Sequence, residues 1–365
     1  MPLTSPPRSG SKPNAKPNLF TPTPPSRFES FLTNPSLFLA EYIYTHQAPI
    51  SPPSHLSNSP SDPRIKLVCI SDTHNSRPPI ATGDVLIHAG DLSVNGSVAE
   101  VKAQADWLAG LKRRKGRGEE GFEQIVVIAG NHETCLDAIY PPNSHLRSQQ
   151  RTRTGIQGAL DTNSKPKTKE KGNRRRRDGD VRINWDDIAY LETQSTKLTL
   201  QTRTLHIYAS PLTPQYGNWV FQYPPHRNIW HNTLPANTDI LITHGPPRGH
   251  LDYTGLYHAG CPHLLREIWR VKPQVHVCGH IHCARGVEVL DWGWVQWGYD
   301  IIVAGEAGRG WRLGWRVCVL VLMSLMWIWE WISWVILGRK RRGMGWIVNA
   351  AIVGDGRVEG VVMEI

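Results

Sequence analysis

The sequence predicts an α/β (α+β) fold, because short apolar runs recur along the chain and a polar cluster follows each one. Runs of this kind, rich in β-branched residues and bounded by glycine or polar residues, are typical of strands buried on both faces. The runs cover residues 65–70, 84–89, 124–129, 239–242 and 274–278. Because open α/β sheets bind ligands outside the carboxyl ends of their strands, we expect the clusters to meet at one sheet edge.

The polar clusters together supply carboxylate, amide and imidazole groups. They are Asp72-Thr73-His74, Gly90-Asp91, Gly130-Asn131-His132-Glu133, Thr243-His244-Gly245-Pro246-Pro247 and Gly279-His280-Ile281-His282. The glycines at 90, 130 and 279 permit tight turns that aim the neighbouring side chains at a common point. An isolated Asp-x-His or Gly-Asp pair is common in surface loops. The specificity of the pattern therefore lies in the order of all five clusters, each after a predicted strand.

This donor set suits two divalent metal ions that share one carboxylate and lie beside one free histidine. Two metals roughly 3.5–4 Å apart can clamp a phosphoryl group and lower the pKa of a bridging water. Asp91 is the candidate for the shared carboxylate. Imidazole combined with carboxylate and amide oxygen suits Mn, Fe, Zn or Co better than Ca, and Mg also stays open, so the residues leave the identity of the metal undecided.

The ordered clusters resemble the motifs of the calcineurin-like metallophosphoesterase superfamily. A narrower similarity is to the small metallophosphoesterase-domain proteins of animals and fungi. It is carried by residues 69–74, 128–133, 210–214, 243–247 and 348–351, within the stretches 64–146, 183–290 and 344–365. The resemblance implies a four-layer αββα sandwich with two mixed sheets. It also implies phosphodiesterase activity on small substrates, with cyclic nucleotides among the candidates.

The superfamily pattern also implies a role for each site residue. It places Asp72, His74, Asp91 and His282 at the first metal, and Asp91, Asn131, His244 and His280 at the second. It implies that His132 is a histidine outside the ligand set that protonates the leaving oxygen, a role that contributes typically about 10²–10⁴-fold to the rate. Glu133, next in the chain, could orient His132. No signature position is substituted, so nothing indicates an inactive enzyme.

We expect one metallophosphoesterase domain over residues 64–365, after a disordered Pro- and Ser-rich tail over residues 1–63. The tail holds half of the 28 prolines, so it buries too little apolar surface to fold readily. Its residues 28–44 are apolar enough for a short docking helix, interrupted at Pro35. Two insertions interrupt the domain, a basic one over residues 147–182 and a Trp-rich apolar one over residues 291–343.

The basic insertion ends in the run Arg174–Arg177 and carries most of the formal net charge of +10. The high charge therefore does not indicate a basic catalytic face. We expect a solvated, disordered loop, with a nuclear-import signal or a contact with a polyanion as alternatives, and nucleic acid is not the favoured partner. The six cysteines are scattered and no signal peptide is visible, which favours reduced thiols in an intracellular, cytoplasmic protein.

The apolar segment 317–337 contains one charged residue, Glu330, and is long enough to cross a bilayer. Its tryptophans and the basic residues 339–342 favour a membrane interface. The stretches 346–351 and 358–365 resemble the last two strands of the domain, however, so both ends of the segment should lie on one side of any membrane. We expect a helix on a membrane surface, through residues 317–342, or a helix packed against the domain. A spanning helix and an internal core helix are the alternatives.

The function expected from these features is metal-dependent hydrolysis of small phosphate esters, with phosphodiesters favoured over phosphomonoesters. The alternative is a non-catalytic, metal-stabilised module that attaches to membrane or nucleic acid through its two insertions. The intact His132 and both histidines of the last cluster favour the enzyme. Six polar or aromatic residues near the motifs are candidates for the substrate cleft, or else ordinary loop residues: Asn218, Trp219, His226, Arg248, His250 and Asp252. The oligomeric state stays open.

Overall fold

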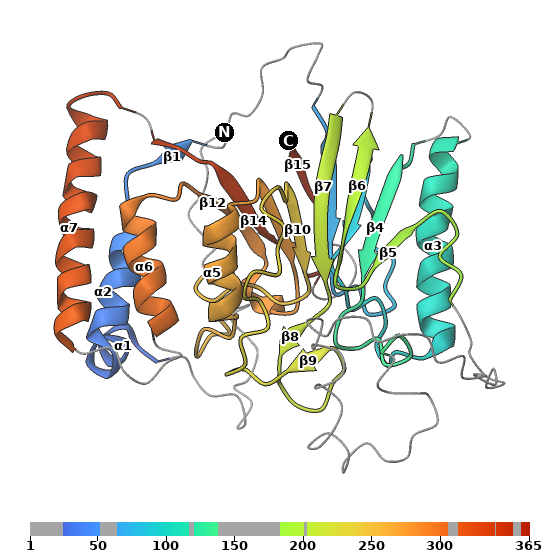
Figure 1. Ribbon diagram of the computed structural model, residues 1–365, viewed down its shortest axis with the longest axis horizontal. Helices are drawn as coiled ribbons and strands as arrows, with labels where there is room; N and C mark the ends of the chain where they lie inside the picture. The colour runs from blue at the N-terminus through green and yellow to red at the C-terminus, as the bar shows by residue number, and fades with distance from the viewer. Residues whose placement is uncertain are drawn as a thin grey trace, which may run out of the picture.

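Two β-sheets face each other at the centre of the molecule, and helices cover both outer sides (Figure 1). The computed structural model describes residues 25–51, 64–116, 120–137, 183–200, 203–305, 313–339, 341–352 and 359–365. One sheet has five strands in the order β15-β2-β3-β4-β5, and the other has six in the order β12-β14-β11-β10-β7-β6. This is the four-layer αββα sandwich with two mixed sheets that the sequence predicts.

The five-stranded sheet contains the first three predicted strands. Its members are β2 (Lys66–Ile70), β3 (Val85–His88), β4 (Gln124–Ile128), β5 (Ala189–Leu191) and β15 (Val361–Glu364). Strands β2 to β5 are parallel, and β15 pairs antiparallel with β2. Helix α3 (Val98–Gly116) covers the outer face, where Leu108 packs with Val68, Leu86 and Val127. Val68 and Leu86 thus face α3 while their neighbours face the other sheet, as strands buried on both sides require.

The six-stranded sheet contains the remaining two predicted strands. Its members are β6 (Gln194–Leu200), β7 (Arg203–Ser210), β10 (Ile240–Thr243), β11 (Val275–Cys278), β12 (Gly286–Leu290) and β14 (Gly345–Asn349). The four central strands are parallel, and the edge strands β6 and β12 run antiparallel to their neighbours. Helix α5 (Pro262–Val271) packs Leu264 and Ile268 against Tyr208 and Leu241 on the outer face. The short strands β8 (Thr213–Pro214) and β9 (Gln222–Tyr223) pair beside it.

The main core lies between the two sheets. Aliphatic side chains from both inner faces fill it, among them Leu67, Ile87, Val126, Ile242 and Val277. The predicted strands begin and end within about two residues of the observed ones. Strands β3, β10 and β11 are buried along their whole length. Continuous apolar runs therefore indicated the central parallel strands correctly.

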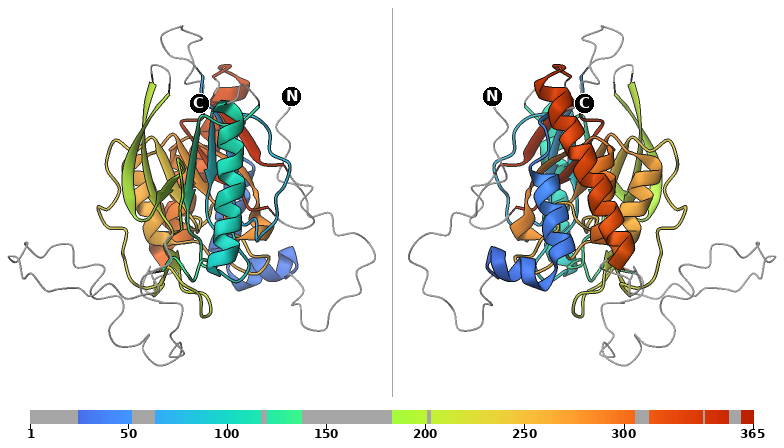
Figure 2. Two further views of the ribbon diagram at one scale, coloured as in Figure 1. Left: turned by 90° about the vertical axis from the view of Figure 1, so that its right-hand side faces the viewer. Right: turned by 90° about the vertical axis from the view of Figure 1, so that its left-hand side faces the viewer.

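A separate group of helices packs beyond α5, and we call it the helical layer. It consists of α2 (Pro35–Thr45), α6 (Trp294–Gly305) and α7 (Leu313–Val335), whose shared core includes Ile43, Tyr299, Val303 and Met323. Figure 2 shows α2 and α7 side by side on this face, with the short helix α1 (Arg27–Thr33) below them. The stretch 28–44 of the predicted tail therefore forms two helices that meet at Pro35, where Asn34 caps the second.

The apolar insertion leaves and rejoins the six-stranded sheet at neighbouring strands. Leu290, the last residue of β12, lies opposite Gly345, the first residue of β14. The chain between them forms α6, α7 and β13 (Arg341–Arg342), and β13 pairs with β1 (Ile50–Ser51). The predicted segment 317–337 lies largely in α7, and both of its ends return to the same domain. Residues 1–24 and 52–63 of the tail, and the predicted basic insertion, lie outside the described residues.

Candidate metal centre

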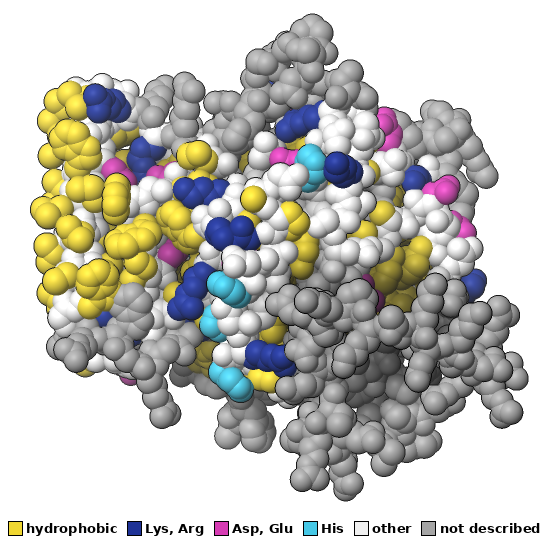
Figure 3. All heavy atoms as spheres, in the orientation of Figure 1, with side chains coloured by type: hydrophobic (Ala, Val, Ile, Leu, Met, Phe, Trp, Pro, Cys, Tyr) yellow, Lys and Arg dark blue, Asp and Glu magenta, His cyan; other side chains and the backbone are white. Residues whose placement is uncertain are grey.

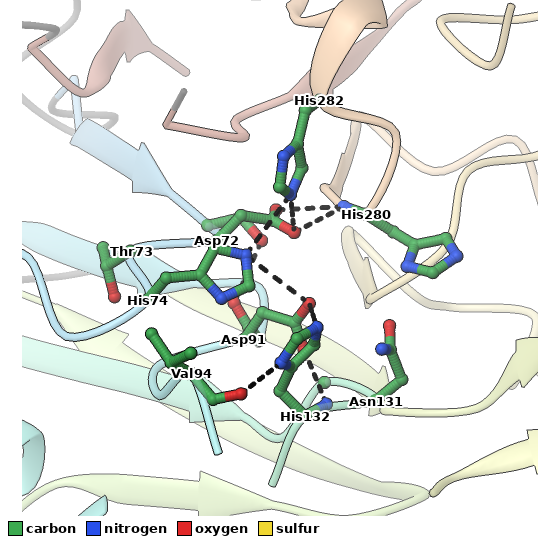
Figure 4. A network of polar contacts seen from close by, with 12 residues as sticks. Asp72, Thr73, His74, Asp91, Val94, Asn131, His132, His280 and His282 are labelled. Atoms are coloured by element: carbon green, nitrogen blue, oxygen red, sulfur yellow. Dashed lines mark hydrogen bonds and ion pairs between the residues drawn. The ribbon is translucent and has the colours of Figure 1, made fainter. Parts of the chain in front are cut away.

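The polar clusters of both sheets converge at the carboxyl ends of the parallel strands (Figure 4). Asp72 follows β2, Asp91 follows β3 and Asn131 follows β4, all from the five-stranded sheet. His244 and His280 follow β10 and β11 of the six-stranded sheet. Each residue reaches the site because its strand ends there, and the two sheets thereby contribute opposite sides of one centre.

Asp91 lies at the middle of the centre. Its Oδ2 is 3.3 Å from Nε2 of His244, 3.9 Å from Nε2 of His132 and 4.0 Å from Nε2 of His74. Its other oxygen, Oδ1, accepts a hydrogen bond of 2.9 Å from the backbone N–H of His132. The backbone thus fixes the carboxylate so that one oxygen faces histidines on both sides.

The ligand atoms fall into groups that share members. Asp72, His74 and His282 form one group in which the atoms lie within 4.8 Å of one another, and Asp91, His244 and His280 form another. The side-chain amide oxygen Oδ1 of Asn131 is 3.0 Å from Nε2 of His244, which adds Asn131 to the second group. A further group joins Asp91 to His74 and His132, so Asp91 links the two halves. Two of these groups consist of residues that the sequence resemblance assigns to one metal each, and the third also contains His132, which the resemblance places outside the ligand sets.

Hydrogen bonds at the far side of two histidines show that these residues fit a metal ion. Nδ1 of His244 donates to the carbonyl oxygen of Ala89 at 2.8 Å, and Nδ1 of His74 donates to that of Ser93 at 3.2 Å. A neutral ring that donates from Nδ1 presents a lone pair at Nε2. With His244 in that neutral form, its Nε2 lone pair faces the oxygens of Asn131 and Asp91, an arrangement of acceptors that a cation satisfies.

The electrostatics of the site keep Asp91 charged and lower the pKa of two of the four candidate histidine ligands, His74 and His280. Burial lowers the pKa of His280 to about 4 and also lowers the pKa of His74. Burial alone would raise the pKa of Asp91, but the charge and hydrogen bond of His244 hold it below its ordinary value. The same ion pair raises the pKa of His244 to about 9 against its burial. The pKa of His282 is raised as well, chiefly by its hydrogen bond to Asp72. A divalent ion requires neutral imidazoles, so metal binding at these positions would release the protons of His244 and His282.

The backbone of the site is held in an uncommon conformation. Asp72, His74, Asp91 and His280 all have positive φ angles, between 43° and 68°. Residues other than glycine rarely adopt this region, and such strain is concentrated at functional sites. The nearby Gly130 is needed for space rather than for a positive φ, because a Cβ there would collide with Oδ1 of Asp91. The sequence indicated Gly130 for the tight turn that it permits, whereas the structure requires a glycine here because of the close approach of Asp91.

Glu133 holds the backbone of the metal-ligand loops through hydrogen bonds and does not orient His132. Its carboxylate accepts backbone N–H bonds from Asp91 at 3.0 Å, Ser93 at 2.9 Å and Gly130 at 2.6 Å. The side chain is fully buried, and burial together with the charge of Asp91 raises its pKa to about 7. The expectation that Glu133 orients His132 is therefore wrong, because its hydrogen bonds go to the strand ends that carry the ligands.

His132 is oriented by two other groups. Its Nδ1 donates to the carbonyl oxygen of Val94 at 2.6 Å, so Nε2 faces Asp91 and the centre (Figure 4). The indole of Trp219 stacks on the imidazole, with ring centroids 4.1 Å apart. Trp219 reaches His132 because Val220, the next residue, donates a backbone hydrogen bond to the carbonyl of Asn131 at 3.2 Å. Sequence reasoning named Trp219 only as a cleft candidate and missed the role of Val94.

Among the other cleft candidates, His250 and Asp252 are buried and have structural partners. His250 bonds Glu288 at 2.9 Å and Asp300 at 2.8 Å, while Asp252 bonds His258 at 2.6 Å. Arg248 donates to the backbone carbonyls of Val303 and His258. Arg248 and His250 therefore tie α6 to the loop after β10, and Asp252 is linked to α2 through His258 and Glu41. Asn218 and His226 are exposed.

Comparison with known proteins agrees with this geometry. The family model for calcineurin-like phosphoesterases matches residues 65–284, which include every predicted ligand. A protein of Emericella nidulans called probable rhamnogalacturonate lyase C is 35% identical over 335 residues, 91% of this chain and 26% of that protein. The human metallophosphoesterase domain-containing protein 1 is 36% identical over 230 residues, 61% of this chain and 62% of that protein. The chain thus spans about a quarter of one relative and three fifths of the other.

Proposed function

The chain belongs to the calcineurin-like phosphoesterase family, and from that premise we propose that it hydrolyses small phosphodiesters. Asp91 is the observation that carries the proposal. Among the described residues, it is the carboxylate that faces candidate ligand histidines of both implied sets, and His132 faces it from outside those sets. A shared carboxylate beside a free imidazole is the arrangement required for phosphoryl transfer at two metals.

The residues divide between the two metal positions as the sequence resemblance implies. Asp72, His74 and His282 would hold one divalent ion, Asn131, His244 and His280 would hold the other, and Asp91 would contact both. When bound, the ions supply Lewis-acid polarisation of the phosphoryl oxygens and a water of lowered pKa. Half of the ligands at each position are imidazole nitrogens, which favours Mn, Fe or Zn over Ca.

His132 supplies the proton for the leaving group in this proposal. Its Nδ1 is committed to the carbonyl of Val94, so Nε2 is the ring atom that can exchange a proton within the centre. As the phosphorus–oxygen bond to the leaving group breaks, the proton moves from Nε2 to the leaving oxygen. The oxygen of water forms the new bond to phosphorus, and its released proton balances the reaction.

The cations near the motifs support a diester over a monoester. A phosphomonoester carries one more negative charge and is commonly held by a bidentate arginine. Arg248, after the fourth cluster, donates to the carbonyls of Val303 and His258. Arg285, after the fifth cluster, donates to the carbonyls of Ala350, Ala351 and Glu359. Both guanidinium groups are thus engaged within the fold, which fits a substrate of lower charge.

The name of the fungal relative does not support lyase activity as a second function for this chain. The match covers 26% of that protein, and the chain matched here carries a complete set of candidate phosphoesterase ligands. The non-catalytic module remains an outcome of the test. It predicts two bound metals without turnover of any phosphate ester.

The test is hydrolysis by the purified full chain, stripped with a chelator and then supplied with Mn. The substrates are bis-p-nitrophenyl phosphate, p-nitrophenyl phosphate and cyclic nucleotides, and the matched control is Asp91→Asn. We expect faster turnover of diesters than of the monoester, and none by the control. Faster turnover of the monoester would overturn the substrate class. Absence of turnover in a protein with two bound metals would overturn the proposal that the chain is an enzyme.

A further inference from the structure

One face of α7 is apolar along its whole length and turned to solvent. The residues follow spacings of three and four, as positions on one helical face do. They are 41% to 65% exposed: Val317, Val321, Leu325, Ile328, Ile332 and Val335. Leu322 and Trp329 border this row and are also about half exposed, at 52% each. We call these eight residues the outer apolar face.

The opposite side of α7 packs against the protein. The outer apolar face is therefore not the surface by which this helix joins the fold. Val319 and Met323 are buried against α2 and α6. Figure 3 shows hydrophobic side chains gathered over α7 at one end of the molecule. Apolar residues of α1 and α2 are also exposed, namely Phe28, Leu32, Leu39 and Tyr42. Soluble monomers rarely expose a contiguous apolar patch of more than a few hundred Å².

We propose that the outer apolar face lies in the plane of an anionic membrane surface and attaches the enzyme to it. The helix Gly314–Val335 has a mean hydropathy of 1.7, which is enough for a bilayer by length and composition. Basic residues mark its two ends, with Arg316 in the first turn and the exposed Arg339 just after the last. Apolar burial would hold the face at the acyl boundary, and the flanking cations would meet the lipid phosphates.

The structure argues against a helix that crosses the bilayer. The ends of the insertion are fixed opposite each other at Leu290 and Gly345 in the same sheet. Behind α7, Asp300 of α6 is buried and pairs at 2.8 Å with His250, from the loop after β10. A crossing would carry this charged cluster into hydrocarbon, where unpaired or partly paired charges are costly. A helix in the interfacial plane leaves the cluster on the aqueous side.

The chemistry of the face favours lipid over a protein partner. Protein interfaces carry about one hydrogen bond per 100–200 Å², so a docking face normally offers donors and acceptors. On α7 the indole N–H groups of Trp327 and Trp331 both donate to the carbonyl of His46. The hydroxyl of Ser324 donates to the carbonyl of Leu320. The charged Glu330 is ion-paired with Arg341 at 2.6 Å. These polar groups are satisfied within the chain, which leaves aliphatic and aromatic surface outward.

The test is co-flotation of the full chain with vesicles. One set is pure phosphatidylcholine, and the other is phosphatidylcholine and phosphatidylserine in equal parts. The variant Val317→Glu/Val321→Glu places two charges on the outer apolar face. The matched control Val287→Glu/Val362→Glu places the same two charges at valines that are 45% and 41% exposed elsewhere. Circular dichroism and hydrolysis verify that both variants fold, and these readouts are separate from vesicle binding.

We expect the wild type and the control to float with the anionic vesicles. The outer-face variant should bind at least about tenfold more weakly, because it loses apolar burial at two positions. Binding should weaken with salt and with Arg339→Gln, and alkaline carbonate should release the protein. Equal binding by both variants, or no binding by the wild type at low salt, would overturn the proposal. Resistance to carbonate would indicate spanning, and a dimer that the outer-face variant splits would indicate a second copy as the occupant. Either result would also overturn it.

Discussion

The indole of Trp219 and the imidazole of His132 are stacked, with ring centroids 4.1 Å apart and planes inclined by 25°. The carbonyl of Val94 fixes the same imidazole through Nδ1. The hydrogen bond to Val94 sets the direction of Nε2, and the stacking with Trp219 limits the tilt of the ring. Because a general acid works only within hydrogen-bond reach of its target, Trp219 is a positioning residue for the proposed proton transfer.

Replacing Trp219 with Ala should reduce turnover of diesters with poor leaving groups by about tenfold, since His132 would lose its stacking partner. Trp219→Phe should restore most of the rate. The loss should be small for bis-p-nitrophenyl phosphate, whose leaving group needs no proton. Tyr216→Ala, at an exposed aromatic residue of the same loop, is the control and should behave as wild type. An equal loss for all leaving groups would indicate a merely structural role.

Replacing His132 with Ala should lower the rate for poor leaving groups by about 10²–10⁴-fold while both metals stay bound. The residue is outside both implied ligand sets, so the metal content measured by plasma emission should not change. A plot of log rate against leaving-group pKa should become steeper than for wild type. Loss of a metal together with the rate would show that His132 is a ligand.

Replacing Asp91 with Asn should nearly abolish hydrolysis and reduce the occupancy of both metal positions. The change keeps the shape of the side chain but removes the charge shared by His74 and His244. Metal titration by calorimetry, with turnover measured in parallel, checks both effects. Wild-type stoichiometry with wild-type turnover would remove Asp91 from the bridging position.

Replacing Glu133 with Gln should destabilise the protein by about 2–4 kcal/mol and weaken metal binding. The carboxylate accepts N–H bonds on both oxygens, and the amide group of Gln would place N–H donors against the N–H of Asp91 and Gly130 or that of Ser93. Urea unfolding at pH 8 measures the change. Glu364→Gln, at an exposed ion pair with Arg64, is the control and should cost about 0–1 kcal/mol. Unchanged stability of Glu133→Gln would contradict the supporting role.

The stability of the helical layer should depend on pH through His258. Burial opposes its charge, but Asp252 at 2.6 Å and Glu41 of α2 at 3.0 Å raise its pKa from 6.5 to about 9. A raised folded pKa gives stability that is complete below about pH 6.5 and is lost as the pH rises through about 9.

His258→Gln should therefore lower the free energy of unfolding by up to about 3 kcal/mol at pH 6 and by much less at pH 10. Urea unfolding of the wild type and the variant across this range checks the slope. Glu41→Gln should remove part of the same pH dependence, since Glu41 is one of the two carboxylates involved. A difference that is constant with pH would show that the ion pairs do not carry the effect.

The sequence predicted most of the centre because its ligands follow buried strands directly. The runs before Asp72, Asp91 and His244 are largely apolar and short, which favoured buried strands. Strands β5, β6 and β7 were not among the strands predicted from apolar runs. In β6, exposed polar residues such as Thr199 alternate with buried Leu198 and Leu200, and this half-exposed strand lacks a continuous apolar run.

The supporting contacts could not be predicted from the sequence, because they join residues far apart in the chain. Nothing beside His250 indicates that Glu288 and Asp300 will neutralise it, or that Tyr44 of α2 will donate to the same Glu288 at 2.6 Å. Glu133 adjoins His132 in sequence, yet consecutive residues of this turn point in different directions. The roles of such residues follow from tertiary packing, which local patterns do not specify.

The pairing of Leu290 with Gly345 also has an evolutionary meaning. Two strands that lie next to each other can be joined by a tight turn or by a long excursion, and the sheet is the same in either case. Chain can be gained or lost at this junction while every strand keeps its register and every ligand its place. On the membrane-surface proposal made above, attachment and the metal centre are therefore encoded in separate parts of the chain.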